Sequence, residues 1–438
     1  MEHFEVVIVG AGPAGFNAAK AVRELYPEKR VLVINDRKEV QIPCSLPWVV
    51  AGKVPLEENA YPLERIKEFG ELLIEKVVSI EPSSQKVFTE TKGFTYEKLI
   101  LATGWRPRVL TVKGSELKGI FYADTSSQKV KELREEVLRA KRVAIVGGGF
   151  ISIGFADVIK RSHPEKEITV IEATNRLASG AFSGSFEVEI EENLKSLGVK
   201  VVKEVKVEGF EGSERVEKVL TSKGEVEAEV VLVFIGFLPR ARLAVEAGIK
   251  TKGGFIEVDD FLRTSADGVL ATGNCVLHHC PITGRELPAM FASVSARDGR
   301  VAGVNTAGPE VRGRTTLPIG ITEVGGELFG FAGYTEEALR KEGIEFKSAK
   351  VKTNDAYPKA IGAKEVEVEA FFRRDGKFLG LQVRGYSRAV WAITETAGRL
   401  IERGLTAKEV IAEVSPAFPT ATPSPLLQPI QEAALKCF

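Results

Sequence analysis

The 438-residue sequence lacks the features of a disulfide-stapled, nucleic-acid-binding or membrane-spanning protein. Its four cysteines are widely and irregularly spaced, so they form no disulfide framework. Its 60 lysine and arginine residues balance 60 aspartate and glutamate residues, which excludes a basic field for nucleic acid and an acidic tail. No apolar run can span a bilayer, and no charged-then-apolar leader precedes the first expected strand. We therefore expect a cytoplasmic protein with no nucleic-acid partner and no membrane partner.

Methionine is also scarce, with two residues, whereas lysine, glutamate and arginine are abundant. This composition favours a thermophilic source. The hydrophobic fraction of 44% is ordinary for a globular protein. The chain is too long for one hydrophobic core, so its length predicts about three domains.

A glycine-rich loop near the start of the chain lies between an apolar run at residues 4–9 and a helical pattern that continues to Leu25. A second apolar run at 31–34 completes a βαβ unit. In such units the glycines let the backbone approach a pyrophosphate at a helix N-terminus, and an acidic group after the second strand binds a ribose hydroxyl. Either Asn35 or Asp36 is the candidate ribose ligand here. The pattern predicts dinucleotide binding by Gly10, Gly12, Pro13, Ala14 and Gly15.

The same unit occurs a second time, with a strand-like run at 142–146, the loop GGGFIS at 147–152 and a second run at 168–171. Ser152 replaces the third glycine and is small enough to allow helix–strand packing. An acid at the ribose position suits an unphosphorylated 2′-hydroxyl, so NADH is expected over NADPH. Two nucleotide sites suggest an electron relay. The candidate residues are Gly147, Gly149, Phe150, Ile151 and Glu172.

Two further segments, LATG at 101–104 and ATGN at 271–274, flank the second unit and suggest that it is inserted into the first. We therefore expect an α/β protein with two Rossmann-like nucleotide-binding domains, one inserted in the other, and a C-terminal α+β domain. The first nucleotide-binding domain would comprise residues 1–112 and 244–314, and the second residues 113–243. Residues 315–438 carry no nucleotide motif and are expected to form an interface domain.

One cysteine, Cys44, lies where redox chemistry would need it, in the stretch QIPCSLPW at residues 41–48. Flanking prolines stiffen this stretch, and Pro47 suits the first turn of a helix. Cys44 would then lie near a helix N-terminus, where the partial positive charge favours the nucleophilic thiolate. The alternative is a buried, inert cysteine.

Taken together, these motifs resemble those of the flavin-dependent pyridine nucleotide–disulfide oxidoreductases over nearly the whole chain. The similarity is greatest to the single-cysteine branch, which includes coenzyme A disulfide reductases and NADH-dependent polysulfide reductases or oxidases. The resemblance is carried by GAGPAG at 10–15, PCSLPW at 43–48, LATG at 101–104, GGGFIS at 147–152, ATGN at 271–274 and PAFPTATPSP at 416–425.

The resemblance implies FAD in the first domain, NADH (possibly NADPH) in the second, and a homodimer formed through the C-terminal domain. Electrons would pass from NAD(P)H through FAD to a disulfide, a polysulfide or a coenzyme A disulfide or persulfide at Cys44. Tyr357 would donate a hydrogen bond or a proton there, or else pack at the dimer interface. The resemblance also implies that Arg23 and Ser45 bind substrate and that further cofactor contacts come from Pro43, Val77, Ala102, Thr103, Gly104, Gly236, Gly273 and Asn274.

Two alternative functions stay open. An NADH oxidase that reduces oxygen would use the same reduced flavin and a sulfenic acid on Cys44. Gly154 stands where the family commonly has Glu, and Asn274 replaces an Asp, which motivates the other alternative of a flavin-binding redox sensor or interaction protein without turnover.

Two other cysteine-containing features are expected to play no part in catalysis. Cys275-x-x-His278-His279-Cys280 offers zinc-type ligands, but adjacent histidines rarely reach one ion, so we expect a surface loop and no metal. Cys437 could resolve a disulfide on Cys44, but we expect the last helix to anchor it.

Overall fold

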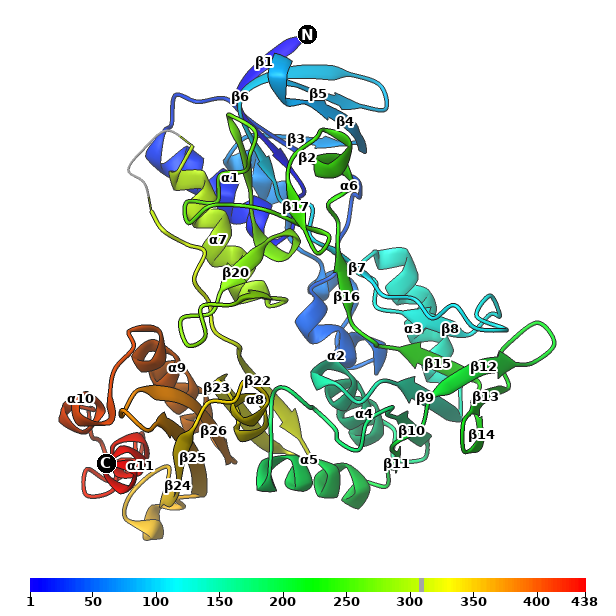
Figure 1. The fold of residues 1–438 in the computed structure, drawn as a ribbon. Helices are drawn as coiled ribbons and strands as arrows, with labels where there is room; N and C mark the ends of the chain where they lie inside the picture. Colours follow the sequence, from blue (N-terminus) through cyan, green and yellow to red (C-terminus); the bar gives the residue numbers. More distant parts are fainter. Residues whose placement is uncertain (307–310) are drawn as a thin grey trace. The chain divides into compact units, whose positions relative to one another are not determined.

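A computed structural model describes residues 1–306 and 311–438 (Figure 1). The chain forms two compact units. The first unit comprises residues 1–108, 123–134 and 236–316, and the second comprises residues 109–122, 135–235 and 317–438. Helix α3 (Ser127–Arg139) begins in the first unit and ends in the second.

The first unit is built on a mixed sheet with the strand order β3-β2-β1-β6-β5-β4, and β19 pairs with β6. Parallel pairing joins β3, β2, β1, β6 and β19, so their carboxyl ends lie at one edge of the sheet. The glycine-rich loop therefore opens where β1 ends. The strands are β1 (Glu2–Val9), β2 (Val31–Asn35), β3 (Glu71–Ile74), β4 (Val77–Glu81), β5 (Lys86–Thr89), β6 (Gly93–Leu101) and β19 (Val269–Ala271).

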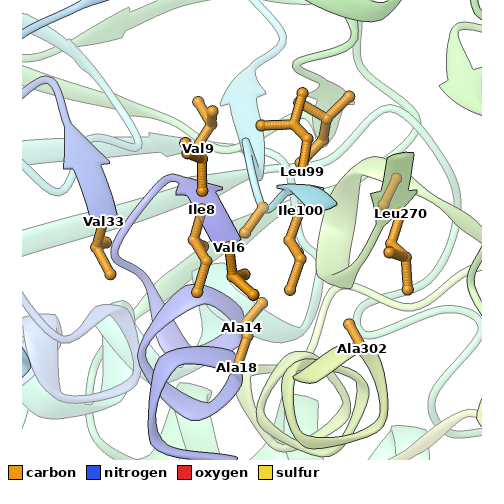
Figure 2. Packing of buried hydrophobic residues seen from close by; sticks show 14 of the residues in the cluster. Val6, Ile8, Val9, Ala14, Ala18, Val33, Leu99, Ile100, Leu270 and Ala302 are labelled. Carbon is orange, nitrogen blue, oxygen red and sulfur yellow. The ribbon is translucent and has the colours of Figure 1, made fainter. Parts of the chain in front are cut away.

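Two helices, α1 (Pro13–Leu25) and α7 (Ala292–Val304), pack against each other in this unit. A Cβ atom at Gly299 would lie 2.1 Å from the carbonyl oxygen of Ala14, so glycine is required for the helices to approach this closely. Small and branched side chains fill the space between sheet and helices. Figure 2 shows this core, with Val6, Ile8, Ile100 and Leu270 from the strands above Ala14, Ala18 and Ala302 from the helices.

The second unit contains an all-parallel sheet with the strand order β11-β10-β9-β15-β8. Helix α4 (Phe150–Ser162) follows β9 directly through the GGG loop, and α5 (Ser185–Ser196) follows later. The strands are β8 (Ile120–Tyr122), β9 (Arg142–Val146), β10 (Glu167–Ile171), β11 (Lys200–Val202) and β15 (Val230–Val233). A three-stranded antiparallel sheet is formed by β12 (Val207–Glu211), β13 (Lys218–Thr221) and β14 (Gly224–Glu227).

The C-terminal part of the second unit is a five-stranded antiparallel sheet with the order β22-β23-β26-β25-β24. Helix α9 (Ala389–Glu402) packs on β23 and β26, and α11 (Pro429–Cys437) packs on β24 and β25. The remaining elements are β22 (Ile319–Val324), β23 (Glu327–Gly333), β24 (Phe346–Asn354), β25 (Glu365–Arg373), β26 (Phe378–Gly385), α8 (Glu336–Lys341) and α10 (Ala407–Ala412).

The architecture confirms the expected fold class of two Rossmann-like sheets, one inserted in the other, and a C-terminal α+β region. The three domain boundaries remain a prediction. Within the second unit, Asp157 of α4 accepts a hydrogen bond from the backbone N–H of Gly325, and Phe150 packs on Phe331. The C-terminal sheet therefore packs directly on the second nucleotide-binding sheet's helices. No helix in residues 1–306 and 311–438 is long and apolar enough to cross a membrane.

One buried carboxyl group makes the stability of the second unit depend on pH. Burial raises the pKa of Glu187 on α5 to about 7, against the opposing charge of Arg176, whose Nη1 lies 3.8 Å away. The unfolded chain loses this proton near 4.5, so between about pH 4.5 and about pH 7 it binds fewer protons than the folded chain. The free energy of unfolding therefore falls as pH rises through this window.

Glu187→Gln mimics the protonated carboxyl group at every pH. We expect it to raise the free energy of unfolding by about 2 kcal/mol at about pH 8 and to change it little at about pH 4. Urea denaturation of both proteins at the two pH values measures this difference. An equal gain at both pH values would contradict the assignment.

Candidate active site

A cavity of about 700 Å³ lies in the first unit, at the carboxyl ends of its parallel strands. It is lined by the glycine-rich loop, the end of β2, the LATG segment, and Thr272 and Asn274 of the ATGN segment. The location is the one at which open α/β sheets bind ligands. Of the predicted cofactor-binding residues, the lining includes Gly10, Gly12, Pro13, Ala14, Asn35, Asp36, Pro43, Val77, Ala102, Thr103, Gly104 and Asn274.

The glycines of the first loop have distinct steric roles. Gly10 has φ +105°, and a Cβ atom there would lie 2.3 Å from the carbonyl oxygen of Ala102. A Cβ atom at Gly15 would lie 1.8 Å from the carbonyl oxygen of Gly10. At Gly12, by contrast, a Cβ atom would meet nothing within 4 Å. Gly10 and Gly15 are therefore needed for the loop itself, and Gly12 leaves open space above the N-terminus of α1.

Asn35, rather than Asp36, occupies the buried position at the end of β2. Its Oδ1 accepts a hydrogen bond from the backbone N–H of Ala11 (3.0 Å), and its Nδ2 donates to the carbonyl oxygen of Arg37 (2.8 Å). The Asp36 carboxylate is exposed and lies 3.8 Å from both Arg37 Nε and Arg240 Nη1. Both residues line the cavity, but only Asn35 is joined to the glycine loop.

The residues present fit a flavin dinucleotide. Thr272 lines the cavity and is fully buried, yet its Oγ1 has no hydrogen-bond partner among the described residues. Since buried polar groups are almost always hydrogen-bonded, this hydroxyl is expected to bond a polar ligand in the cavity. Asn274 accepts a hydrogen bond from Ser295 Oγ (2.7 Å), which fixes its amide at the cavity wall. Gly273 lies behind this wall, since a Cβ atom there would be 3.0 Å from the Cβ of Ala14.

The second glycine loop, in the second unit, repeats the construction of the first. A Cβ atom at Gly147 would lie 2.3 Å from the carbonyl oxygen of Phe234, and one at Gly149 would meet nothing within 4 Å. Glu172 accepts hydrogen bonds from the backbone N–H groups of Gly148 (2.6 Å) and Thr174 (2.7 Å). Glu172 thus occupies the position that Asn35 occupies in the first unit.

Three other residues singled out near the second loop have different surroundings. Ile151, at the start of α4, is 39% exposed. A Cβ atom at Gly154 would have only Thr322 Oγ1 within 4 Å, at 3.9 Å, so the structure gives no steric reason for glycine there. Gly236 lies in the first unit and accepts a hydrogen bond from the backbone N–H of Arg108 (2.9 Å).

Cys44 is exposed, in a short 3₁₀ helix (Pro43–Ser45) that leads into helix α2 (Leu46–Val50). Pro47 lies in the first turn of α2, as its sequence context predicts. The expectation of a lowered thiol pKa is wrong for the chain alone. Desolvation by surrounding protein raises the pKa of Cys44, and its own backbone N–H offsets only part of this rise. Helices of three and five residues have few aligned peptide dipoles, so the effect of desolvation on the thiol pKa outweighs that of the helix N-terminus.

Cys275, Cys280 and Cys437 are buried, and all four cysteines are free thiols. The expectation of a surface loop at residues 275–280 is therefore wrong, because Cys275, His278 and Cys280 pack in the interior. His278 Nε2 lies 2.6 Å from Oδ2 of Asp298 in α7, and both side chains are fully buried. The histidine therefore has a structural role, which is to pack against α7. No group of three or more His, Cys, Asp or Glu residues that could hold a metal ion occurs within the described part of the chain. Cys437 lies in α11 and is 5% exposed.

The sequence pattern missed a phenol and two amides beside Cys44. Tyr61 lines the cavity together with Pro43, and its backbone N–H donates to Val40 (2.8 Å). Burial and the negative charge of a Cys44 thiolate raise the pKa of Tyr61 to about 12, so the phenol keeps its proton. Gln41 and Asn59 are buried and hydrogen-bonded to each other. The signal available in the sequence was a polar residue, Gln41, close to the turn that carries Cys44.

The three predicted substrate or tail residues have the following contacts. Ser45 donates a hydrogen bond to Asn59 Oδ1. Arg23 does not line the cavity, and its guanidinium donates to the carbonyl oxygens of Phe69 (3.1 Å) and Pro27 (2.5 Å). Tyr357 is half-buried in the second unit, and its backbone N–H donates to Pro419 (2.8 Å). Their roles toward substrate stay predictions.

Comparisons with known proteins agree on one family. A sequence profile described as pyridine nucleotide-disulphide oxidoreductase matches residues 4–304. The chain is 31% identical over 416 residues to the NAD(P)H coenzyme A polysulfide/persulfide reductase of Pyrococcus horikoshii, with 92% of each chain covered. It is 28% identical over 396 residues to an NADH oxidase of Methanocaldococcus jannaschii, covering 87% of this chain and 88% of that one. The solved structure of an NAD-dependent persulfide reductase from A. fulgidus matches with a TM-score of 0.91 at 26% identity, covering 98% of this chain and 82% of that one.

Proposed function

Because the chain belongs to the pyridine nucleotide-disulphide oxidoreductase family, whose members use FAD and NAD(P)H, we propose that it reduces a sulfur–sulfur bond through Cys44. The substrate class is a disulfide, a polysulfide, or a coenzyme A disulfide or persulfide. One observation carries this proposal: the exposed cysteine follows Pro43, which lines the cavity that fits FAD. The names of the relatives from P. horikoshii and A. fulgidus support the same substrate class.

The chain's own residues would hold both cofactors at helix N-termini. The pyrophosphate of FAD would lie over Gly12 at the start of α1, and that of NAD(P)H over Gly149 at the start of α4. Thr272 Oγ1 would donate a hydrogen bond to the flavin dinucleotide. FAD, when bound, would supply the redox chemistry by which two electrons from NAD(P)H reach the sulfur substrate.

Cys44 performs the covalent chemistry on the substrate. Its thiolate attacks one sulfur of a disulfide, the substrate's S–S bond breaks, and a mixed disulfide with Cys44 forms while one thiolate leaves. Two electrons from NAD(P)H and one proton then release the second thiol and restore the Cys44 thiolate. The nearby phenol of Tyr61 retains its proton at neutral pH and can hydrogen-bond a thiolate.

An acceptor screen tests this proposal. Anaerobic NADH oxidation is measured with coenzyme A disulfide, polysulfide and glutathione disulfide, and oxygen is tested separately under air. We expect at least one sulfur acceptor to be reduced about tenfold or more faster than oxygen. Rapid oxygen reduction with no response to any sulfur acceptor would instead establish the oxidase alternative, which the M. jannaschii relative favours.

Glu172 supports a preference for NADH over NADPH, because a carboxylate at this position suits a ribose 2′-hydroxyl and repels a 2′-phosphate. We expect Glu172→Ser to reduce the ratio of kcat/KM for NADH to that for NADPH by about tenfold or more. The ratio is measured by steady-state kinetics with the same sulfur acceptor. An unchanged ratio would show that Glu172 serves only to hold the loop through Gly148 and Thr174.

We also propose that two copies of the chain associate through the C-terminal region of the second unit and that the enzyme works in the cytoplasm. Large apolar side chains are exposed there, including Trp391 (59%), Val414 (92%) and Leu426 (89%). Exposed apolar groups of this size are typical of protein interfaces. Light scattering on the purified protein gives the oligomeric state.

The four free thiols fit a reducing compartment, which supports the cytoplasm as the location. Tyr357 is retained as a proposed hydrogen-bond donor to the sulfur substrate.

A further inference from the structure

We propose that Asn59 is a positioning residue for Cys44: its buried side-chain amide fixes the short turn that carries the thiol. This inference rests on the proposed role of Cys44 in sulfur reduction. Asn59 lies in the 3₁₀ helix Glu57–Asn59, fifteen positions beyond Cys44, and is 2% exposed. It does not line the cavity and so acts through the turn.

Asn59 holds the turn from both sides of Cys44. Its Oδ1 accepts a hydrogen bond from Ser45 Oγ, and its Nδ2 donates to Gln41 Oε1 (3.0 Å) and to the carbonyl oxygen of Ile42 (3.1 Å). Its backbone carbonyl also accepts from the N–H of Ile42 (2.9 Å). Three residues flanking the thiol, one of them directly adjacent, are thus bonded to one side chain.

Gln41 extends this connection to a distant segment of the same unit. Its side chain is fully buried, and its Nε2 donates to Ser127 Oγ (3.0 Å) at the start of α3. Its backbone N–H donates to the carbonyl oxygen of Thr125 (2.7 Å). The turn is therefore anchored through Asn59 and Gln41 to the first residue of α3 and to the segment just before it.

A hydrogen-bonded network of amides fixes the orientation of the turn more strictly than apolar contacts would. Hydrogen bonds weaken steeply away from linearity, and a buried amide left without partners is destabilising because its lost bonds to water are not replaced. Rotation of the turn would break the hydrogen bonds of Asn59 and Gln41 and is therefore disfavoured. Buried, satisfied networks of this kind specify one conformation.

The turn's conformation matters because the Cys44 backbone N–H acts on the Cys44 sulfur. That N–H is the group that lowers the pKa of the thiol against the effect of desolvation. Its alignment with the sulfur depends on the backbone angles of the Pro43–Ser45 turn. Asn59 thereby preserves both the direction of the thiol and the fraction of thiolate available for attack.

The test compares Asn59→Leu with Gln382→Leu. Leucine has nearly the shape of asparagine but makes no hydrogen bond. Gln382 is an equally buried amide in the second unit, where its Oε1 accepts from the N–H of Ser183 (2.7 Å), so its replacement controls for loss of a buried amide. The readouts are the pH dependence of Cys44 alkylation by iodoacetamide, resolved by peptide mass spectrometry, and separate kcat and KM values.

For Asn59→Leu we expect the midpoint of Cys44 alkylation to move upward by about half a pH unit or more, and kcat to fall about tenfold to a hundredfold. KM for NADH should stay within about twofold. Gln382→Leu should leave the alkylation midpoint unchanged. Equal behaviour of the two variants in alkylation would overturn the inference. If the sulfur acceptors prove inactive while the alkylation midpoint moves, the positioning role stands and the proposed function fails.

Ser127→Ala keeps the inference testable if Asn59→Leu does not fold. It removes only the remote hydroxyl that anchors Gln41. We expect a smaller upward shift of the alkylation midpoint in the same direction. No shift in Ser127→Ala, with Asn59→Leu unfolded, would also overturn the inference.

Discussion

Cys44→Ser is expected to abolish sulfur reduction, with kcat lower by about 10³-fold or more, while bound FAD is still reduced by NADH. The hydroxyl of serine is a far weaker nucleophile than a thiolate and forms no mixed disulfide. None of the other cysteines can replace it, because Cys275, Cys280 and Cys437 are buried. The measurement pairs acceptor-dependent NADH oxidation with anaerobic bleaching of the flavin absorbance by NADH.

A matched control is Cys437→Ser, which removes a free thiol that is buried in α11. This variant should retain the sulfur-reducing activity of the wild type. Full activity in Cys44→Ser would exclude the cysteine from the reaction and would leave direct reduction by the flavin as the explanation.

Gly12→Val is expected to lower FAD content by about tenfold or more without unfolding the chain. Gly12 has φ −69° and no atom within 4 Å of an added Cβ, so the apoprotein accommodates valine. The added methyl groups would instead fill the space over the N-terminus of α1. Released flavin, measured per polypeptide after heating, gives the FAD content, and circular dichroism reports the fold.

Gly149→Val is the crossed control, because Gly149 has φ −74° and equally open surroundings at the N-terminus of α4. It should retain FAD but lose most NADH-dependent flavin reduction. If Gly12→Val kept its FAD, or if Gly149→Val lost it, the assignment of the two cofactors to the two units would be wrong.

The two glycine loops could be predicted from sequence because their determinants are local. Strand, loop and helix follow one another within about thirty residues, and the close approach of Gly15 to Gly10 lies within the loop itself. The steric demand at Gly10 and Gly147, by contrast, comes from Ala102 and Phe234, which follow the neighbouring strands β6 and β15. The insertion of the second sheet could also be predicted, because LATG and ATGN mark both segments of the first. Their strands β6 and β19 pair directly in the structure.

The surroundings of Cys44 could not be predicted, because they depend on contacts between distant segments. The short helix was expected, but its length and the desolvation of the thiol by surrounding protein decide the direction of the pKa change of Cys44. Asn59 joins the turn through a buried hydrogen-bond network that no spacing pattern indicates. Similarly, the guanidinium of Arg23 bonds the carbonyl oxygen of Phe69, which lies 46 residues away.

The covalent role of Cys44 is tested by the mass of the oxidised enzyme after mixing with coenzyme A disulfide in the absence of NADH. We expect one coenzyme A adduct per chain, located on Cys44 by peptide mass spectrometry and lost when NADH is added. An unmodified Cys44, or an adduct that persists with excess NADH, would exclude a mixed disulfide on Cys44 as the intermediate for this acceptor. The same measurement with polysulfide, read as added sulfur on Cys44, extends the test to the second substrate class.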